Sequence, residues 1–127
     1  MSEQNHENMV GWIDISVADL ERAVAFYGAV LNRKIEIHSF DGFEFGVVDH
    51  GPGNGGCIVP DRDFKPQTTG HLLYFGVNGR LKAAIAAATE KGGEVVQDVH
   101  AIGPHGWRAL VLDSEGNRIA LHSDHND

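Results

Sequence analysis

One stretch of this sequence decides the fold: Val10-Gly-Trp-Ile-Asp-Ile-Ser-Val-Ala-Asp-Leu-Glu-Arg-Ala-Val-Ala-Phe-Tyr-Gly-Ala-Val-Leu31. Within it, Ile13, Ile15 and Val17 alternate with polar or aromatic neighbours, which is typical of a strand with two different faces. From Leu20 onward the apolar residues recur at helical spacing, and Asp19 offers a side-chain cap for the first free amides. The stretch therefore predicts a strand that leads into an amphipathic helix packed on its Ile13 face.

The opposite face of this predicted strand carries Trp12, Asp14 and Ser16. A helix that covers the Ile13 face leaves these three side chains free to contact something else. An aromatic ring, a carboxylate and a hydroxyl on one face are suited to a binding site, so this face is the first candidate for function.

The same plan recurs about sixty residues later, where Leu73 and Phe75 correspond to Ile13 and Ile15. A helix follows from Leu81 and ends at a glycine pair, 92–93. Further strands are predicted at Lys34–Ser39, Phe43–Asp49, Gly56–Val59, His71–Val77, Glu94–Val99, Trp107–Asp113 and Arg118–His122. The order βαβββ thus occurs twice. We expect an α+β fold in which two such modules form a curved mixed sheet with both helices on its outer face.

A chain of 127 residues has room for one domain with a modest core. We predict a single domain over residues 9–123, made of the repeats 9–59 and 70–123. The polar ends, residues 1–8 and 124–127, are expected to be flexible tails.

The composition, 42% apolar and 22% charged, is that of an ordinary globular protein. Because no run of eighteen apolar residues occurs, we expect no membrane span, and the polar start of the chain has no signal-peptide pattern. A single cysteine, Cys57, excludes an internal disulfide. These features together favour a cytoplasmic protein.

The formal net charge of −8 argues against nucleic acid as a partner, because nucleic acid binds basic surfaces. An acidic surface would suit a cationic or amphipathic ligand. Acidic surfaces also keep proteins soluble, and that simpler explanation stays open.

The first and last segments resemble a known family. The run Trp12 to Leu31 looks like the opening of the vicinal oxygen chelate superfamily, which includes glyoxalase I, bleomycin-resistance proteins and extradiol dioxygenases. The ending Gly106 to His122 is similar to that family's last hairpin, with Ser114 in place of its usual proline. The resemblance implies a cup for a small molecule. It also implies a homodimer in which each cup takes one module from each subunit.

Metal-using members of that family place His, Gln or Glu ligands on the first and last strands of each module. The corresponding positions here carry Trp12, Gly56 or Cys57, Leu72, and Ala120. Trp, Gly, Leu and Ala have no side chain that ligates a divalent metal. We therefore expect neither a metal nor another cofactor, although His71 or His122 would be the ligands if a metal did bind.

The candidate binding residues combine aromatic walls with polar groups, as a small-molecule pocket requires. They are Trp12, Asp14, Tyr74, His105, Trp107 and His122. Trp12, Tyr74 and Trp107 are expected to line the cup, while the other three supply polar contacts. The alternative for the aromatic residues is that they fill a narrowed cup or an oligomer interface.

Two functions stay open at this point. The first is a glyoxalase/bleomycin-resistance-like protein that binds a small aromatic or cationic molecule in a metal-free cup. The second is a lyase, isomerase or dioxygenase of the same superfamily. Such an enzyme would use non-standard metal ligands, or Asp14 and His122 as a metal-free acid–base pair.

Overall fold

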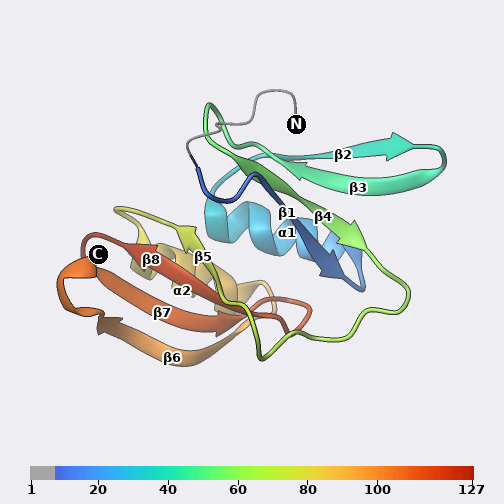
Figure 1. Ribbon diagram of the computed structural model, residues 1–127. Coiled ribbons are helices and arrows are strands. Elements are labelled where there is room, and N and C mark those ends of the chain that lie inside the picture. Colours follow the sequence, from blue (N-terminus) through green and yellow to red (C-terminus); the bar gives the residue numbers. More distant parts are fainter. Residues whose placement is uncertain (1–7) are drawn as a thin grey trace.

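The first strand and helix form where the change of apolar period predicts them (Figure 1). The structure, a computed structural model, describes residues 8–127, so the predicted N-terminal tail falls outside it except for Asn8. Strand β1 spans Trp12–Val17 and helix α1 spans Leu20–Leu31. The Asp19 side chain accepts the backbone N–H of Arg22 at 3.0 Å, which caps α1.

The remaining elements repeat this plan and confirm two βαβββ modules of an α+β fold. They are β2 (Ile35–Phe40), β3 (Phe43–Val48), β4 (Gly55–Pro60), β5 (Leu73–Gly76), α2 (Leu81–Glu90), β6 (Glu94–Ala101), the short 3₁₀ helix η1 (Gly103–His105), β7 (Trp107–Leu112) and β8 (Arg118–Ser123). Each module has one four-stranded mixed sheet, with orders β1-β4-β3-β2 and β5-β8-β7-β6. In each sheet the first strand runs parallel to the last, and the other pairs are antiparallel.

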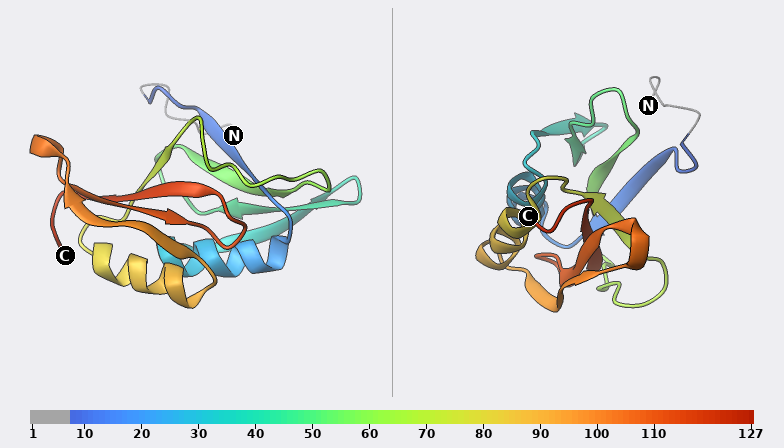
Figure 2. Two further views of the ribbon diagram at one scale, coloured as in Figure 1. Left: turned by 90° about the horizontal axis from the view of Figure 1, so that it is seen from below. Right: turned by 90° about the vertical axis from the view of Figure 1, so that its left-hand side faces the viewer.

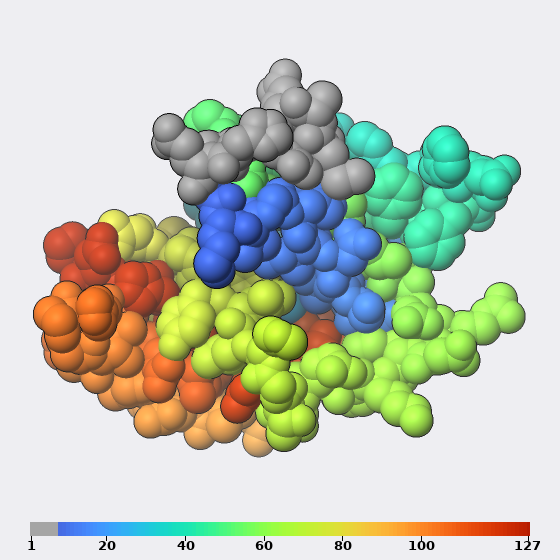
Figure 3. Space-filling view, in the orientation of Figure 1, coloured from blue at the N-terminus to red at the C-terminus, as the bar shows by residue number. Residues whose placement is uncertain are grey.

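The β2–β3 hairpin turns through Asp41 and Gly42, which both have positive φ, at 55° and 79°. This is the two-residue turn that an Asp-Gly pair predicts. The hairpin projects from the body of the first module (Figures 1 and 3). At its tip the Phe40 side chain is 75% exposed, so the hairpin presents apolar surface to solvent.

Both helices lie along the same side of the two sheets (Figure 2), and α1 and α2 also contact each other. Buried side chains from both modules form one apolar core: Ile15, Val17, Ala23, Phe26, Tyr27, Val30, Val48, Ile58, Val77, Leu81, Ala84, Ala88, Val111, Ile119 and Leu121. Because this core crosses the boundary between the repeats, the two modules fold as one unit. No helix within residues 8–127 is long and apolar enough to span a membrane.

A polar clamp joins α1 to the turn between β7 and β8. The buried Tyr27 hydroxyl donates to Asp113 Oδ2 at 2.5 Å, and Asp113 Oδ1 accepts the backbone N–H groups of Glu115 and Asn117 at 2.8 and 2.9 Å. Burial and the neighbouring Asp113 carboxylate raise the pKa of Tyr27 well above its usual value. The Asp113 carboxylate therefore holds the turn closed and ties it to the first module.

Glu115 forms the second half of this clamp. Its carboxylate accepts the backbone N–H of Ala18 and of Asp19, at 3.1 and 3.0 Å, and pairs with the Arg22 guanidinium at 2.7 and 2.8 Å. Burial by itself raises the pKa of the Glu115 carboxyl, but the hydrogen bonds from Arg22 and Asp19 outweigh it and lower that pKa to about 2. Folding therefore favours the ionised form of Glu115.

We predict that Glu115→Gln lowers the free energy of unfolding at pH 7 by about 1–3 kcal/mol, because a charged acceptor of five hydrogen bonds, one of them from the Ser114 hydroxyl, is lost. The lower part of this range applies if water screens the half-exposed Arg22 strongly. The folded pKa is depressed, so the contribution is complete above the unfolded value of 4.5 and disappears as the pH falls toward 2. Urea denaturation of both proteins between pH 7 and pH 2 measures this difference.

The exposed Glu90, at the end of α2, provides the control for this experiment. Glu90→Gln should change the free energy of unfolding by no more than about 0.5 kcal/mol. A Glu115→Gln deficit that stayed constant from pH 7 to pH 2 would contradict the role assigned to the ionised carboxylate.

Candidate functional site

The face of the first sheet that points away from α1 combines aromatic and acidic side chains. Strand pairing places Asp14 beside Cys57, and Cys57 beside Val47, so alternate residues of these strands share one face. We call this surface the first-sheet face; it carries Trp12, Asp14, Ser16, Glu36, His38, Phe43, Phe45, Val47 and Cys57. The prediction that Trp12 and Asp14 lie opposite the helix-covered side of β1 is confirmed.

The corresponding face of the second sheet carries basic side chains. Tyr74 pairs with Ala120, Gly76 with His122, and His122 in turn with Arg108. We call this surface the second-sheet face; it carries Tyr74, Gly76, Glu94, Gln97, His100, Arg108, Leu110, Leu112, Arg118, Ala120 and His122. The predicted facing of Tyr74 and His122 is therefore confirmed.

The predicted facing of Trp107 is wrong. Trp107 pairs with Ser123 and Ala101, so it lies on the opposite side of β7 from Arg108. There its half-buried ring packs against the apolar core. The strand begins directly after Gly106, whose φ of 95° redirects the chain. Because of this change of direction, the sequence of the preceding loop does not tell which face of β7 Trp107 occupies.

Trp12 contacts two neighbours on the first module. Its ring lies edge-on to the His50 imidazole, with 5.6 Å between the ring centroids, and its side chain hydrogen-bonds the Cys57 thiol. Burial raises the pKa of Cys57; the Trp12 hydrogen bond lowers it and the Asp14 charge raises it, with a net increase. The thiol therefore stays protonated near neutral pH, which makes it a poor nucleophile and a poor metal ligand.

His122 and His105 come together, but through the backbone. His122 Nε2 lies 2.7 Å from the carbonyl oxygen of His105 in η1. Because a carbonyl only accepts, Nε2 of His122 carries the hydrogen. His105 itself is exposed, and its carbonyl places η1 beside the second-sheet face.

Asp14 and His122 do not form the predicted acid–base pair within one chain. Asp14 lies on β1 of the first sheet and His122 on β8 of the second, and no hydrogen bond joins them within residues 8–127. His71, the other residue considered as a metal ligand, is exposed ahead of β5. Within residues 8–127 of the single chain, no contact between Asp14 and His122 therefore supports a metal-free acid–base mechanism that uses both.

Arg108 is the functional candidate that the sequence reasoning missed. Its Nε–H donates to Nε2 of His100 at 3.0 Å, and its Nη1 donates to the Tyr74 hydroxyl. The guanidinium carbon also lies 5.9 Å from the centre of the Tyr74 ring. Counting back from the turn at residues 114–117 pairs Arg108 with His122 across the last hairpin, and that count could have identified it.

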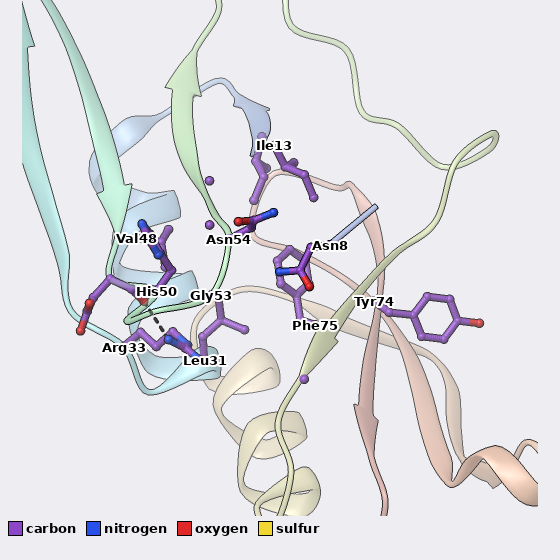
Figure 4. A pocket seen from close by; sticks show the side chains of 15 residues that line it. Asn8, Ile13, Leu31, Arg33, Val48, His50, Gly53, Asn54, Tyr74 and Phe75 are labelled. Carbon is purple, nitrogen blue, oxygen red and sulfur yellow. Dashed lines mark hydrogen bonds between the residues drawn. The ribbon is translucent and has the colours of Figure 1, made fainter. Parts of the chain in front are cut away.

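A pocket of about 370 Å³ lies between the first module and β5. It is lined by Asn8, Ile13, Ile15, Leu31, Arg33, Val48, Asp49, His50, Gly53, Asn54, Gly55, Gly56, Tyr74, Phe75 and Gly76. Figure 4 shows Phe75 among the lining side chains, while the Tyr74 ring points away from them. This difference follows from the alternation of β5 and directs the Tyr74 ring to the second-sheet face.

A second pocket of about 320 Å³ lies at the other end of β1, near the segment that connects the modules. Asp14, His71 and Arg118 are among its polar lining residues. Trp12 lines neither of these two pockets. Of the three aromatic residues predicted to line one cup, Trp12 thus lies on the first-sheet face, Tyr74 on the second-sheet face, and Trp107 on neither.

The comparison with known proteins agrees with this architecture. The family model described as a glyoxalase-like domain matches residues 12–122. The chain belongs to the glyoxalase-like domain family. The match runs from the first residue of β1 to the fifth residue of β8 and so includes both βαβββ modules of the glyoxalase-like domain.

Solved structures share the fold of this glyoxalase-like protein. A hypothetical protein from S. aureus matches with a TM-score of 0.72 and 18% identity, covering 91% of this chain and 94% of that one. A glyoxalase/bleomycin resistance protein from Albidiferax ferrireducens matches at 0.67 and 21%, covering 91% and 99%. The fosfomycin resistance protein FosX from Listeria monocytogenes matches at 0.68 and 15%, covering 91% and 93%. No curated protein sequence matches this chain significantly.

The side chains of this glyoxalase-like protein do not fit the divalent metal of the superfamily. Asp14 in the first module corresponds to Tyr74 in the second. Asp14 pairs with Cys57 and Tyr74 pairs with Ala120, so Cys57 rather than Gly56 corresponds to Ala120. The four positions then hold Trp12, Cys57, Leu72 and Ala120, of which only the protonated thiol is a possible donor. Within the described part of the chain, no three His, Cys, Asp or Glu side chains are arranged to hold a metal ion.

We predict that untagged protein incubated with Zn²⁺, Ni²⁺, Mn²⁺ or Fe²⁺ and then desalted retains far less than one ion per chain. An affinity tag must be absent because the chain has eight histidines of its own. Elemental analysis by mass spectrometry measures the retained metal. Retention of one ion per chain would contradict the conclusion that these side chains do not fit a divalent metal. If Cys57→Ala, His71→Ala or His122→Ala then abolished the retention, that residue would be identified as a metal ligand.

Proposed function

We propose that this glyoxalase-like protein binds a small aromatic or cationic molecule without a metal, with Trp12 and Asp14 as its contacts on the first-sheet face. The observation that carries the proposal is Trp12, which occupies the position of a metal ligand with its indole beside an exposed carboxylate on the same face. An indole next to an acid stabilises an aromatic or cationic group through stacking, cation–π attraction and charge.

Tyr74, His105 and His122 supply the remaining contacts of the proposed site. The Tyr74 ring is half exposed, and His122 is oriented by its hydrogen bond to the His105 carbonyl. These groups lie on or beside the second-sheet face, whereas Trp12 lies on the first. One ligand contacts both sets if the first-sheet face of one subunit meets the second-sheet face of another.

We propose a homodimer of this kind. The first-sheet face carries the carboxylates of Asp14 and Glu36. The second-sheet face carries the guanidinium groups of Arg108 and Arg118 and the carboxylate of Glu94, so the side chains of the two faces differ in the sign of their net charge. The projecting hairpin adds exposed apolar side chains from Ile37, Phe40 and Phe43. Exposed apolar groups of this size on a hairpin indicate an association surface.

Tryptophan fluorescence tests the proposed ligand contact, because the chain has only two tryptophans. In Trp107→Phe the remaining reporter is Trp12, and we expect saturable quenching by aromatic ligands such as benzylammonium and benzoate. In Trp12→Phe the reporter is Trp107, which packs against the core, and we expect no saturable change. Equal responses of the two variants, or none in either across an aromatic library, would contradict the proposal.

Light scattering coupled to size-exclusion chromatography tests the dimer. We expect a two-chain mass for the natural protein and a shift toward one chain for Phe40→Ser, because the hairpin loses its most exposed large apolar side chain. Val96→Ser is the matched control, since Val96 is 54% exposed on β6 at the far edge of the second sheet. A monomeric natural protein would contradict the proposed dimer.

A further inference from the structure

We infer that Arg108, together with the Tyr74 hydroxyl, forms an oxyanion-binding site on the second-sheet face, which takes the carboxylate or phosphate group of a small molecule. The inference rests on the proposed function for the small molecule, but not on the contacts at Trp12. It assigns a negative group to this part of the ligand.

The first argument is the hydrogen-bond inventory of Arg108. A guanidinium has five N–H groups. One N–H is bound by His100 and one by the Tyr74 hydroxyl, and the other three have no acceptor within residues 8–127. No nitrogen of Arg108 is both buried and without a hydrogen-bond partner, so these three N–H groups are accessible to solvent or to a ligand.

The second argument is charge. The ion pair between Arg22 and Glu115 is the only one within the described part of the chain, so Arg108 is not neutralised by a carboxylate. The nearest acid along its neighbouring strand, Asp98, uses Oδ1 to accept the backbone N–H of Val99. An unpaired, half-buried guanidinium in a chain with net charge −8 attracts an anion locally.

The third argument is that the guanidinium is already oriented. Nδ1 of His100 lies 2.8 Å from the Asp98 carbonyl oxygen, which only accepts, so Nδ1 carries the hydrogen and Nε2 is free to accept from Arg108. The Tyr74 ring supports the other end of the guanidinium at 5.9 Å. A donor fork that is held from two sides loses little conformational freedom when a ligand binds.

Neighbouring groups complete the site. Because the Tyr74 oxygen accepts from Arg108, its own hydrogen is available to a ligand oxygen. Gly76 pairs with His122 on the same face, and a Cβ built on Gly76 would meet no atom within 4 Å, so there is open space beside the imidazole. Buried Ala120 contributes only a methyl group next to Tyr74.

The chemistry selects carboxylates and phosphates. Their oxygen pairs match the two parallel N–H groups of a guanidinium fork, and a hydroxyl donor beside the fork adds a third hydrogen bond. An aromatic carboxylate or phosphate monoester would also offer a ring to the half-exposed Tyr74.

Nuclear magnetic resonance of ¹⁵N-labelled full-length protein tests the site with four probes: benzoate, phenyl phosphate, inorganic phosphate and benzylammonium. We expect benzoate and phenyl phosphate to shift the Nε–H signal of Arg108 and the amide signals of Gly76 and His122 saturably. Arg108→Gln should weaken this binding by about tenfold or more, as expected for the loss of a charge-assisted bidentate contact. Tyr74→Phe should weaken it less, because the ring is kept.

The control is Arg62→Gln, which removes one positive charge from an exposed residue of the connecting segment and should leave binding unchanged. Arg108→Lys keeps the charge but loses the fork, and we expect intermediate affinity. The amide spectrum of each variant shows directly whether its fold is intact. Inorganic phosphate that binds as tightly as phenyl phosphate would support a site for free phosphate rather than for the head group of an organic ligand.

Unchanged anion affinity in Arg108→Gln would overturn the inference. So would an Arg108→Gln variant that dissociates the dimer without any change in anion affinity. The fluorescence of Trp107→Phe separates this failure from failure of the proposed function. Saturable quenching of Trp12 without anion-induced shifts at Gly76 and His122 would leave the proposed function standing and overturn the oxyanion site. Anion shifts without any response of Trp12 would support the oxyanion site and contradict the proposed contact at Trp12.

Discussion

The clamp between α1 and the β7–β8 turn is the constraint on which the rest of this structure depends. Two carboxylates of that turn, Asp113 and Glu115, bind Tyr27, Arg22 and the first backbone amides near α1. Without these bonds, the modules would be joined by the shared apolar core and by a few hydrogen bonds from Arg80 and Asn117 to backbone carbonyls of the first module. Because Asp113 also closes the turn, it sets the register of the last hairpin. The pairing of Arg108 with His122 on that hairpin therefore depends on the same carboxylate that binds Tyr27 of the other module.

The spacing of apolar residues and their alternation along strands were sufficient to predict the fold and the facing of four candidate site residues. Alternation along continuous strands correctly assigned the faces of Trp12, Asp14, Tyr74 and His122, because no loop interrupts the count. The same count failed at Trp107, where a glycine with positive φ precedes the strand. It also left Gly56 and Cys57 as alternatives, because a glycine-rich loop comes before β4, and strand pairing resolved them.

The contacts of Arg108 could not be predicted in this way. Its partner His100 lies on β6, where the register shifts between Val95 and Gln97 and again between Gln97 and His100. Each irregularity reverses or offsets the facing of later residues, so counting along β6 does not locate the imidazole. The second partner, Tyr74, is separated from Arg108 by thirty-four positions and two strand pairings. Only the folded chain brings the three side chains together.

Net charge and local charge lead to different expectations for the ligand. The total of −8 favours a cation, but that total is summed over the entire surface. At physiological ionic strength, exposed charges more than about 8 Å apart are largely screened. The charge preferred in a ligand is therefore set by the groups that the ligand contacts. Trp12, Cys57, Leu72 and Ala120 stand where metal-using members of the superfamily are expected to hold their metal, so a ligand of this protein needs other fixed groups to orient it. A guanidinium held by His100 and Tyr74 has that property, because its donors are already aligned before any ligand arrives.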